Sequence, residues 1–247
     1  MTQRKALTDA RGFSLLESLV ALVVMSIMMT AVLSQIGQIQ QRARTEQIKL
    51  DIFQQSREFM DQFDRDLRQA GYPTLRMFDT NPADGWSPAL ASPSTGDTRI
   101  AVGVIKIAAN EIEFEGDVDG DGQVDVVDYQ LVSSGDGCPC LQRSQILKSS
   151  STTVFSTQIQ NIQSAGTSSD PIFIAYKGDG TSVTSADMTT TTGQQDLAGI
   201  KTVQFTVKVK ADVVDPQTRV APETSLAGQV LLRNCSLASS GQYNSCS

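Results

Sequence analysis

An unbroken apolar run near the N-terminus constrains this chain more than any other feature of its sequence. Residues 13–33 form a run of 21 that is apolar except at Ser14, Glu17, Ser18, Ser26 and Thr30. As a helix, such a run is roughly 30 Å long, which is about the hydrocarbon thickness of a bilayer. Residues 1–12 carry a net charge of +2, and basic flanks stay in the cytoplasm. The sequence therefore predicts one transmembrane helix over residues 13–34, with the remaining chain exported.

The position of this run differs from that of an ordinary secretory signal. Such signals are cut after a shorter apolar region, at a site with small residues. Here Gly12 is the plausible cleavage position and lies before the apolar run, so cleavage would leave the helix on the mature chain. Glu17 also places a carboxylate inside the expected membrane segment, and such groups usually have a partner. Together these features predict a leader peptide over residues 1–12.

The segment RGFSLLE at residues 11–17 resembles the type IV prepilin motif. The resemblance implies that a prepilin peptidase cuts after Gly12 and methylates the new N-terminal residue, Phe13. It also implies that Glu17 pairs with the N-terminal amine of a neighbouring pilin, because opposite charges attract strongly in a medium of low dielectric. The implied partners are other pilins, the inner membrane, the peptidase and the inner-membrane assembly platform. The alternative is a plain signal anchor.

Beyond the membrane segment, residues 35–71 are expected to continue the helix as an amphipathic stretch. Apolar residues recur at helical spacing, namely Phe53, Met60, Phe63, Leu67 and Ala70, a stripe suited to packing on a sheet. Gly71 and Pro73 follow as helix-stop signals. Residues 64–72 resemble the end of the long helix in PilW-type minor pilins and in J-type pseudopilins of type II secretion.

Residues 72–247 are expected to form an exported, β-rich domain. Alternating or short apolar runs predict strands at 100–107, 111–115, 127–131, 172–176, 201–210 and 226–232. Residues 73–99, 149–170 and 178–199 are rich in Pro, Gly, Ser and Thr and are expected to be loops, with Trp86 covering a local core. The fold class is therefore α+β and pilin-like, with a long N-terminal helix packed on an antiparallel sheet.

An acidic segment at residues 117–128 has the spacing of a calcium-binding loop. Carboxylates stand at positions 1, 3, 5, 9 and 12 of the segment, and glycine stands at position 6. The expected ligands are Asp117, Asp119, Asp121, Gln123, Asp125 and Asp128. Such loops wrap the cation in side-chain oxygens and one main-chain carbonyl, here that of Gln123. Position 12 is Asp rather than Glu, as in dockerin-type loops, which the segment resembles. The alternative is a β-hairpin whose Asp and Gly residues serve only the turn.

Four cysteines follow the membrane segment, at Cys138, Cys140, Cys235 and Cys246. An even number in an exported domain indicates disulfides, with three possible full pairings. Cys235 and Cys246 bracket a polar C-terminal loop that resembles the disulfide-closed region of many pilins. A bond between Cys138 and Cys140 would be strained, which makes a partner elsewhere an alternative, and the pairing of these two cysteines stays open.

Composition excludes several functions. The chain has no histidine, which removes Ser-His-Asp and Cys-His catalysis and His-based zinc sites. Its net charge is −7, without a basic patch in the body, which argues against nucleic acid. Glu113 and Glu115 are expected on a solvated strand face, so no enzyme is predicted.

The function expected from the resemblance is a minor pilin that initiates or caps a type IV pilus, anchored in the inner membrane before assembly and exposed on the cell-surface pilus afterwards. Two alternatives stay open. One is a type II secretion pseudopilin, and the other is a ligand-binding adhesin at the pilus tip.

Overall fold

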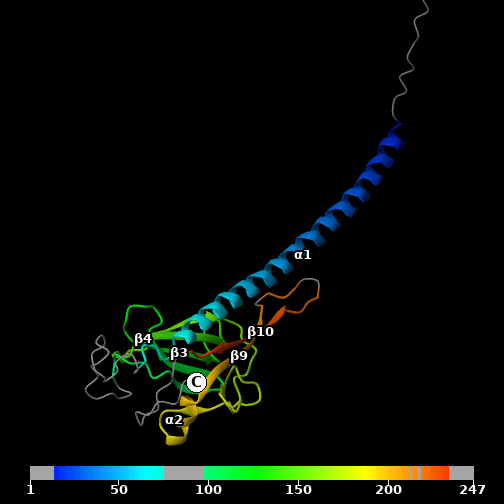
Figure 1. The fold of residues 1–247 in the computed structure, drawn as a ribbon. Coiled ribbons are helices and arrows are strands. Elements are labelled where there is room, and N and C mark those ends of the chain that lie inside the picture. The colour runs from blue at the N-terminus through cyan, green and yellow to red at the C-terminus, as the bar shows by residue number, and fades with distance from the viewer. Residues whose placement is uncertain (1–13, 75–96, 212, 216–217, 234–247) are drawn as a thin grey trace, which may run out of the picture.

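A computed structural model describes residues 14–74, 97–211, 213–215 and 218–233. Its first element is a single helix, α1, which runs from Leu15 to Gln69. The first half of α1 projects from the body, and the second half lies across it (Figure 1). Nearly every residue from 15 to 44 is exposed, and the first buried residue is Thr45. The helix therefore divides into a free apolar half and a packed amphipathic half.

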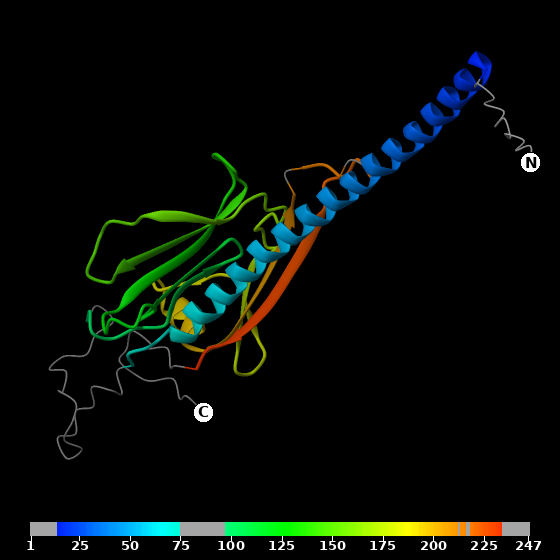
Figure 2. The same ribbon diagram turned by 90° about the horizontal axis from the view of Figure 1, so that it is seen from above.

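The body contains two antiparallel sheets. Sheet A has the strand order β5-β4-β3-β2-β1-β8 and sheet B the order β10-β9-β6-β7. The elements are β1 (Val104–Ala108), β2 (Glu111–Gly116), β3 (Asp125–Val132), β4 (Cys140–Leu147), β5 (Phe155–Ile159), β6 (Phe173–Lys177), β7 (Ser182–Val183), β8 (Ala186–Asp187), α2 (Thr191–Ala198), β9 (Ile200–Lys210) and β10 (Glu223–Leu231). Figure 2 shows α1 lying over the body with β10 beside it. The α+β, pilin-like architecture expected from the sequence is confirmed.

The core forms where α1 meets both sheets. Phe63 of α1 is fully buried, with its ring centroid 5.1 Å from that of Tyr129 in sheet A. On its other side it lies 4.9 Å from Phe205 and 5.7 Å from Phe173, both in sheet B. Edge-on and offset ring pairs at these distances add to the gain from burial itself. Phe63 therefore joins the helix to both sheets.

The end of α1 is also joined to sheet A through the backbone. The amide of Gly71 donates to the carbonyl of Glu115 at 2.8 Å, and Ala70 forms an isolated bridge with Gly116. Gly71 has a φ of +79°, as expected of a glycine that ends a helix. A Cβ on Gly116 would lie 2.5 Å from the carbonyl oxygen of Gln69. Only glycine fits this contact without a shift of the backbone.

The helical stripe was predicted well except at one end. Phe63, Leu67 and Ala70 are buried as expected, but Phe53 is 58% exposed. Phe59, which the stripe omitted, is buried in its place. The body begins to cover α1 only near residue 45, and Phe53 lines an open groove beside Pro222 and Glu223 at the start of β10. Sequence periodicity alone does not show that the body leaves this part of the stripe uncovered.

Five elements were not predicted from the sequence, including the two-residue strands β7 and β8, which lie in the segment 178–199 that was expected to be loop. Strand β4 was not predicted at all, because CLQRSQIL lacks a clear alternation. Strand β5 and helix α2 lie in segments expected to be loops. Both are rich in Ser, Thr and Gln, whose weak intrinsic preference is overridden by pairing with β4 and by the burial of Leu197. The expected strand at 100–107 starts only at Val104.

Candidate functional site

The free half of α1 is exposed, and it is apolar, with few exceptions, as far as Leu33. It is the one helix, among those in the described ranges, that is long and apolar enough to cross a membrane. Two of its hydroxyl groups are satisfied within the helix, since Ser26 donates to the carbonyl of Leu22 and Thr30 to that of Ser26, both at 2.8 Å. Such bonds let a hydroxyl lie in hydrocarbon without an unmet hydrogen bond.

Glu17 is the one ionisable residue in the apolar run, and it lies in the first turn of α1. Its side chain is exposed. The N-terminus of a helix carries a partial positive charge, which favours a carboxylate there. Gly12 and Phe13, the expected cleavage and methylation positions, lie outside the described residues. The same holds for Trp86, Cys235 and Cys246.

The packed half of α1 is attached to the body by buried polar contacts that sequence reasoning did not find. Asp66 accepts hydrogen bonds from Tyr129 and from Nε of Arg143, each at 2.7 Å. Burial, with Asp66 adding, raises the pKa of Tyr129 well above its usual value, so the phenol stays protonated and donates. Nearer the membrane side, Thr45 donates to Asp215 in the loop after β9 at 3.0 Å. These contacts fix the direction in which α1 leaves the body.

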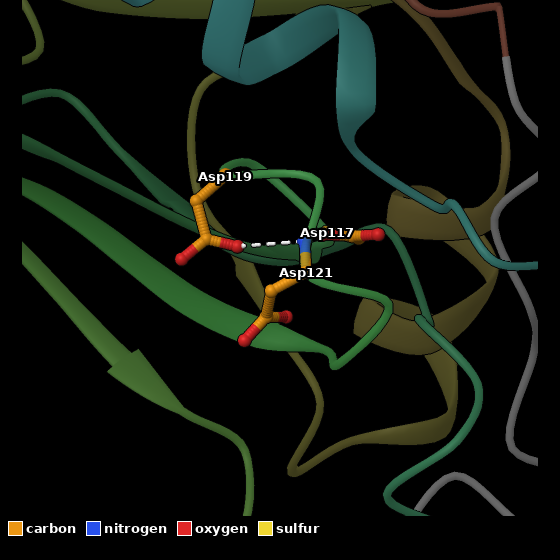
Figure 3. Close-up of side chains that lie close together, drawn as sticks. All are labelled: Asp117, Asp119 and Asp121. Carbon is orange, nitrogen blue, oxygen red and sulfur yellow. Dashed lines mark hydrogen bonds between the residues drawn. The ribbon is translucent and has the colours of Figure 1, made fainter.

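The acidic segment forms the turn of the β2–β3 hairpin. Asp117, Asp119 and Asp121 each offer a carboxylate oxygen, and these oxygens lie within 4.8 Å of one another (Figure 3). Asp117 accepts from the amides of Gly120 and Gly122, which both have positive φ. The loop is therefore a glycine-shaped turn that gathers three carboxylates, including the buried Asp117.

The other expected ligands divide between two places. Asp125 begins β3 beside the loop, where it is buried and accepts a hydrogen bond from Gln145 at 2.9 Å. Burial, with the loop carboxylates adding, raises the pKa of Asp125 to about 6 against the effect of that bond. Gln123 uses its side-chain amide to donate to Asp121 at 2.9 Å.

Asp128 does not join the loop cluster. It lies three residues after Asp125 on the same strand, and side chains an odd number apart point to opposite faces of a sheet. Its partners in register are Glu113 on β2 and Ser144 on β4. The twelve-residue spacing is therefore wrong as a complete ligand set, because the second half of the segment is a strand and cannot wrap back around a cation.

Cys138 and Cys140 are bonded to each other, with a Cα–Cα distance of 4.3 Å. Of the pairings left open by the sequence, the structure therefore has these two cysteines bonded to each other and not to partners elsewhere. Glycines with positive φ at 135 and 137 shape the turn before β4, and the amide of Cys138 donates to the carbonyl of Gly135. This tight turn brings the two side chains together at the start of β4.

Glu115 was expected to face solvent and is instead 6% exposed. It pairs with Lys148 at 2.8 Å and accepts from the amide of Val102 at 2.9 Å. Lys148 also donates to the carbonyl of Ile100 at 3.0 Å. The segment before β1 thus covers the end of β2. Lys148 lies outside any recognisable pattern, so no sequence signal pointed to this pair.

Comparison with known proteins finds one motif, which lies at the N-terminal end of the chain and extends into the free half of α1. The model of the prokaryotic N-terminal methylation motif matches residues 7–33, which include the expected cleavage position and the start of α1. No curated protein matches the chain. Over residues 7–33 the chain is therefore similar to proteins that carry this methylation motif, and the long apolar helix that begins within it is consistent with membrane anchoring.

Proposed function

We propose that this chain is a minor subunit of a type IV pilus, acting in pilus initiation and held at or near the tip. The observation that carries the proposal is the free half of α1. It exposes large apolar side chains over residues 15–39, with one carboxylate, Glu17, in its first turn. A surface of that kind is stable only in a bilayer or against other helices. The methylation motif overlaps this half of the helix and supports packing against other helices as well as insertion in a bilayer.

The sequence of events follows from the charges. Cleavage after Gly12 by a prepilin peptidase leaves a positive amine on Phe13, four residues before Glu17. In the bilayer both charges are costly, and an ion pair between neighbouring subunits relieves both. Entry into the filament, through the inner-membrane assembly platform, thus exchanges lipid contacts for helix contacts and pairs the carboxylate.

A test compares cells that lack the protein with cells that carry the Glu17→Ala chain. The initiation role predicts strongly reduced piliation in both, with the variant accumulating in the inner membrane. The control is Glu46→Ala, an exposed carboxylate on the same helix, which leaves piliation unchanged. Normal piliation in the deletion strain contradicts the proposal.

Two other roles differ in phenotype. A type II secretion pseudopilin, supported by the resemblance of residues 64–72, would block protein secretion and leave pili intact when deleted. A tip adhesin would leave both pili and secretion intact and abolish attachment to a surface.

We also propose that the β2–β3 turn binds calcium, with Asp117, Asp119 and Asp121 as side-chain ligands and Asp125 beside them. Hard cations favour clusters of carboxylate oxygens, and exported modules bind calcium at 10⁻⁴–10⁻³ M, to order of magnitude. Three mutually repelling carboxylates within 4.8 Å support a cation there.

Calorimetry of the full chain in detergent micelles tests calcium binding. Calcium chloride should give a saturable heat that weakens at least tenfold in an Asp119→Asn, Asp121→Asn double variant. The matched control, Asp136→Asn, removes an exposed carboxylate from a different turn of the same sheet and should bind as the parent does. Absence of heat at millimolar calcium would exclude the site.

A further inference from the structure

Strand β10 lies at one edge of sheet B and is the longest edge strand among the described residues. Sheet A ends at β5 and β8, and sheet B ends at β10 and β7. Strand β10 has nine residues, whereas β5 has five and β7 and β8 have two each. It pairs with β9 residue by residue from Glu223 to Leu231, without a bulge. A long, regular edge of this kind is open to pairing with another chain.

The hydrogen bonds at the two ends of the β9–β10 ladder show which peptide groups of β10 are free. The amide of Ala211 donates to the carbonyl of Pro222, and the amide of Leu232 donates to that of Lys201, both at 2.8 Å. Bonded and non-bonded pairs alternate in an antiparallel ladder, so the even-numbered residues of β10 bond to β9. The odd-numbered residues from 223 to 231 direct their N–H and C=O groups outward. Among the described residues, these outward groups have no hydrogen-bond partner.

The free edge of β10 also lacks the features that usually discourage pairing. Such features are lysine or proline on the edge strand, a bulge, or a very short strand. From Thr224 to Leu231, β10 has no charged residue and no proline. The side chains of its odd-numbered residues Ser225, Ala227 and Gln229 are uncharged and exposed. Nothing in the sequence of β10 therefore opposes the approach of a further strand.

An open groove of about 310 Å³ lies beside the start of this edge, where β10 runs along α1 (Figure 2). Leu50 and Phe53 of α1 line one side of it, and each is 58% exposed. Pro222 and Thr224 line the other side. Successive side chains of a strand point to opposite faces. A strand added to β10 would therefore turn every second side chain toward α1 and into this groove.

We propose that the free edge of β10 binds an extended segment of another protein chain, in which apolar side chains alternate with basic or uncharged polar ones. The segment pairs antiparallel with β10, and its apolar side chains fill the groove against Leu50 and Phe53. Main-chain hydrogen bonds supply affinity in this mode of recognition, and the groove selects alternate side chains. The net charge of −7 on this chain favours lysine or arginine over acidic residues in the partner.

A second copy of β10 fits the edge less well. Strand β10 and α1 run in the same direction, since Phe53 lies at the start of β10 and a Cβ on Gly228 would lie 3.2 Å from Met60. Two β10 strands paired antiparallel would therefore point their apolar half-helices in opposite directions, away from any shared membrane. This step rests on the membrane anchoring proposed above. The rest of the inference concerns the body alone, so its failure would leave the proposed function standing.

The test measures hydrogen exchange of the β10 amides by NMR, with the full chain in detergent micelles. The probe is a synthetic peptide with blocked ends and the sequence of residues 201–210, in which Val and Phe alternate with polar residues and three are lysine. Cross-strand neighbours share one face of a sheet. When Val and Phe enter the groove, the amides of the polar residues therefore face β10 and those of Val and Phe face away.

Two versions of the peptide use this difference. The probe version is N-methylated at Val203, Phe205 and Val207, which leaves the amides toward β10 free. It should slow exchange of the amides of Ser225, Ala227 and Gln229 at least tenfold, saturably. The control version carries the same number of N-methyl groups at Gln204, Thr206 and Lys208, and it should slow exchange less than twofold.

Variants assign the binding to the edge and to the groove. Ala227→Pro removes one outward amide and should weaken the probe peptide at least tenfold, because proline cannot donate to the added strand. Ala227→Val keeps that amide and should bind as the parent does. Phe53→Ser should weaken binding at least threefold, whereas Val154→Ser, which replaces an apolar side chain that is 70% exposed outside the groove, should leave it unchanged. Circular dichroism confirms that each variant is folded.

The proposal is overturned if the probe peptide does not slow exchange, or if both peptides slow it equally. It is also overturned if Ala227→Pro or Phe53→Ser leaves the affinity unchanged. Slow exchange of the outward amides without any peptide contradicts it as well, because the rest of the chain or a second copy would then already cover the edge.

Discussion

Asp66, in the last turns of α1, lies 2.7 Å from Nε of Arg143 on β4, and both side chains are almost fully buried. The pair is completed by the phenol of Tyr129, which donates to the same carboxylate oxygen. Leaving one member of such a pair unpartnered is strongly destabilising. This contact, rather than the apolar stripe alone, makes α1 and sheet A one rigid unit.

The first prediction concerns that pair. Asp66→Ala should lower the free energy of unfolding by about 3–5 kcal/mol, because it leaves the Arg143 charge buried without its partner. Urea denaturation of the full chain in micelles, followed by tyrosine fluorescence, measures the change. The control is Asp64→Ala on the same helix, which breaks the exposed pair with Arg68 and should cost less than about 1 kcal/mol. Equal losses in the two variants would refute the role given to Asp66.

The second prediction concerns the contact between α1 and β2. Gly116→Ala places a methyl group 2.5 Å from the carbonyl oxygen of Gln69. The backbone must move, so we expect a loss of about 1–3 kcal/mol in the free energy of unfolding. Gly37→Ala is the matched control, because nothing lies within 4 Å of the added methyl group.

In that control the same substitution falls in an exposed helix, where alanine is favoured over glycine by up to about 1 kcal/mol. Opposite signs for the two substitutions are expected in thermal or urea unfolding. A neutral Gly116→Ala would show that the end of α1 is not held tightly against β2.

The third prediction concerns pH. Burial, with Glu111 and Glu113 adding and Lys106 opposing, raises the pKa of Asp128 to about 7. In the unfolded chain the same group titrates near 4, to within about half a unit. The folded state therefore holds this proton more tightly. Its contribution to stability is fully present below about pH 4 and is lost as the pH rises through 7.

Asp128→Asn removes this dependence, because the amide is never charged. At pH 8 the variant should be more stable than the parent by on the order of 1 kcal/mol, after allowance for screening of a partly exposed group. The difference should vanish as the pH approaches 4. Urea unfolding at pH 4, 6 and 8 measures it, and Asp136→Asn, an exposed carboxylate, should show no such trend. A variant less stable than the parent at pH 8 would contradict the raised pKa of Asp128.

The sequence predicted the parts of the fold that local pattern controls. The alternation of Val203, Phe205, Val207 and Val209 gave β9, and all four side chains are buried as expected. The helical spacing of Phe63 and Leu67 gave the face of α1 that packs. In each case the signal is repeated within one element, so it survives without knowledge of the tertiary structure.

The parts that were missed depend on contacts between distant segments. Lys148 and Glu115 are 33 residues apart, and neither position marks the other. Asp128 fitted the calcium spacing by count, but strand geometry after Asp125 turns it to the opposite face. The Cys138–Cys140 bond depends on the shape of one tight turn. Such features appear only when the register of β2, β3 and β4 is known.

The most direct test of the central claim is mass spectrometry of purified filaments, with digestion that preserves the N-terminal peptide. The mature chain is expected to begin at Phe13, with its amine methylated. Recovery of this protein from filaments with residues 1–12 still attached would contradict it.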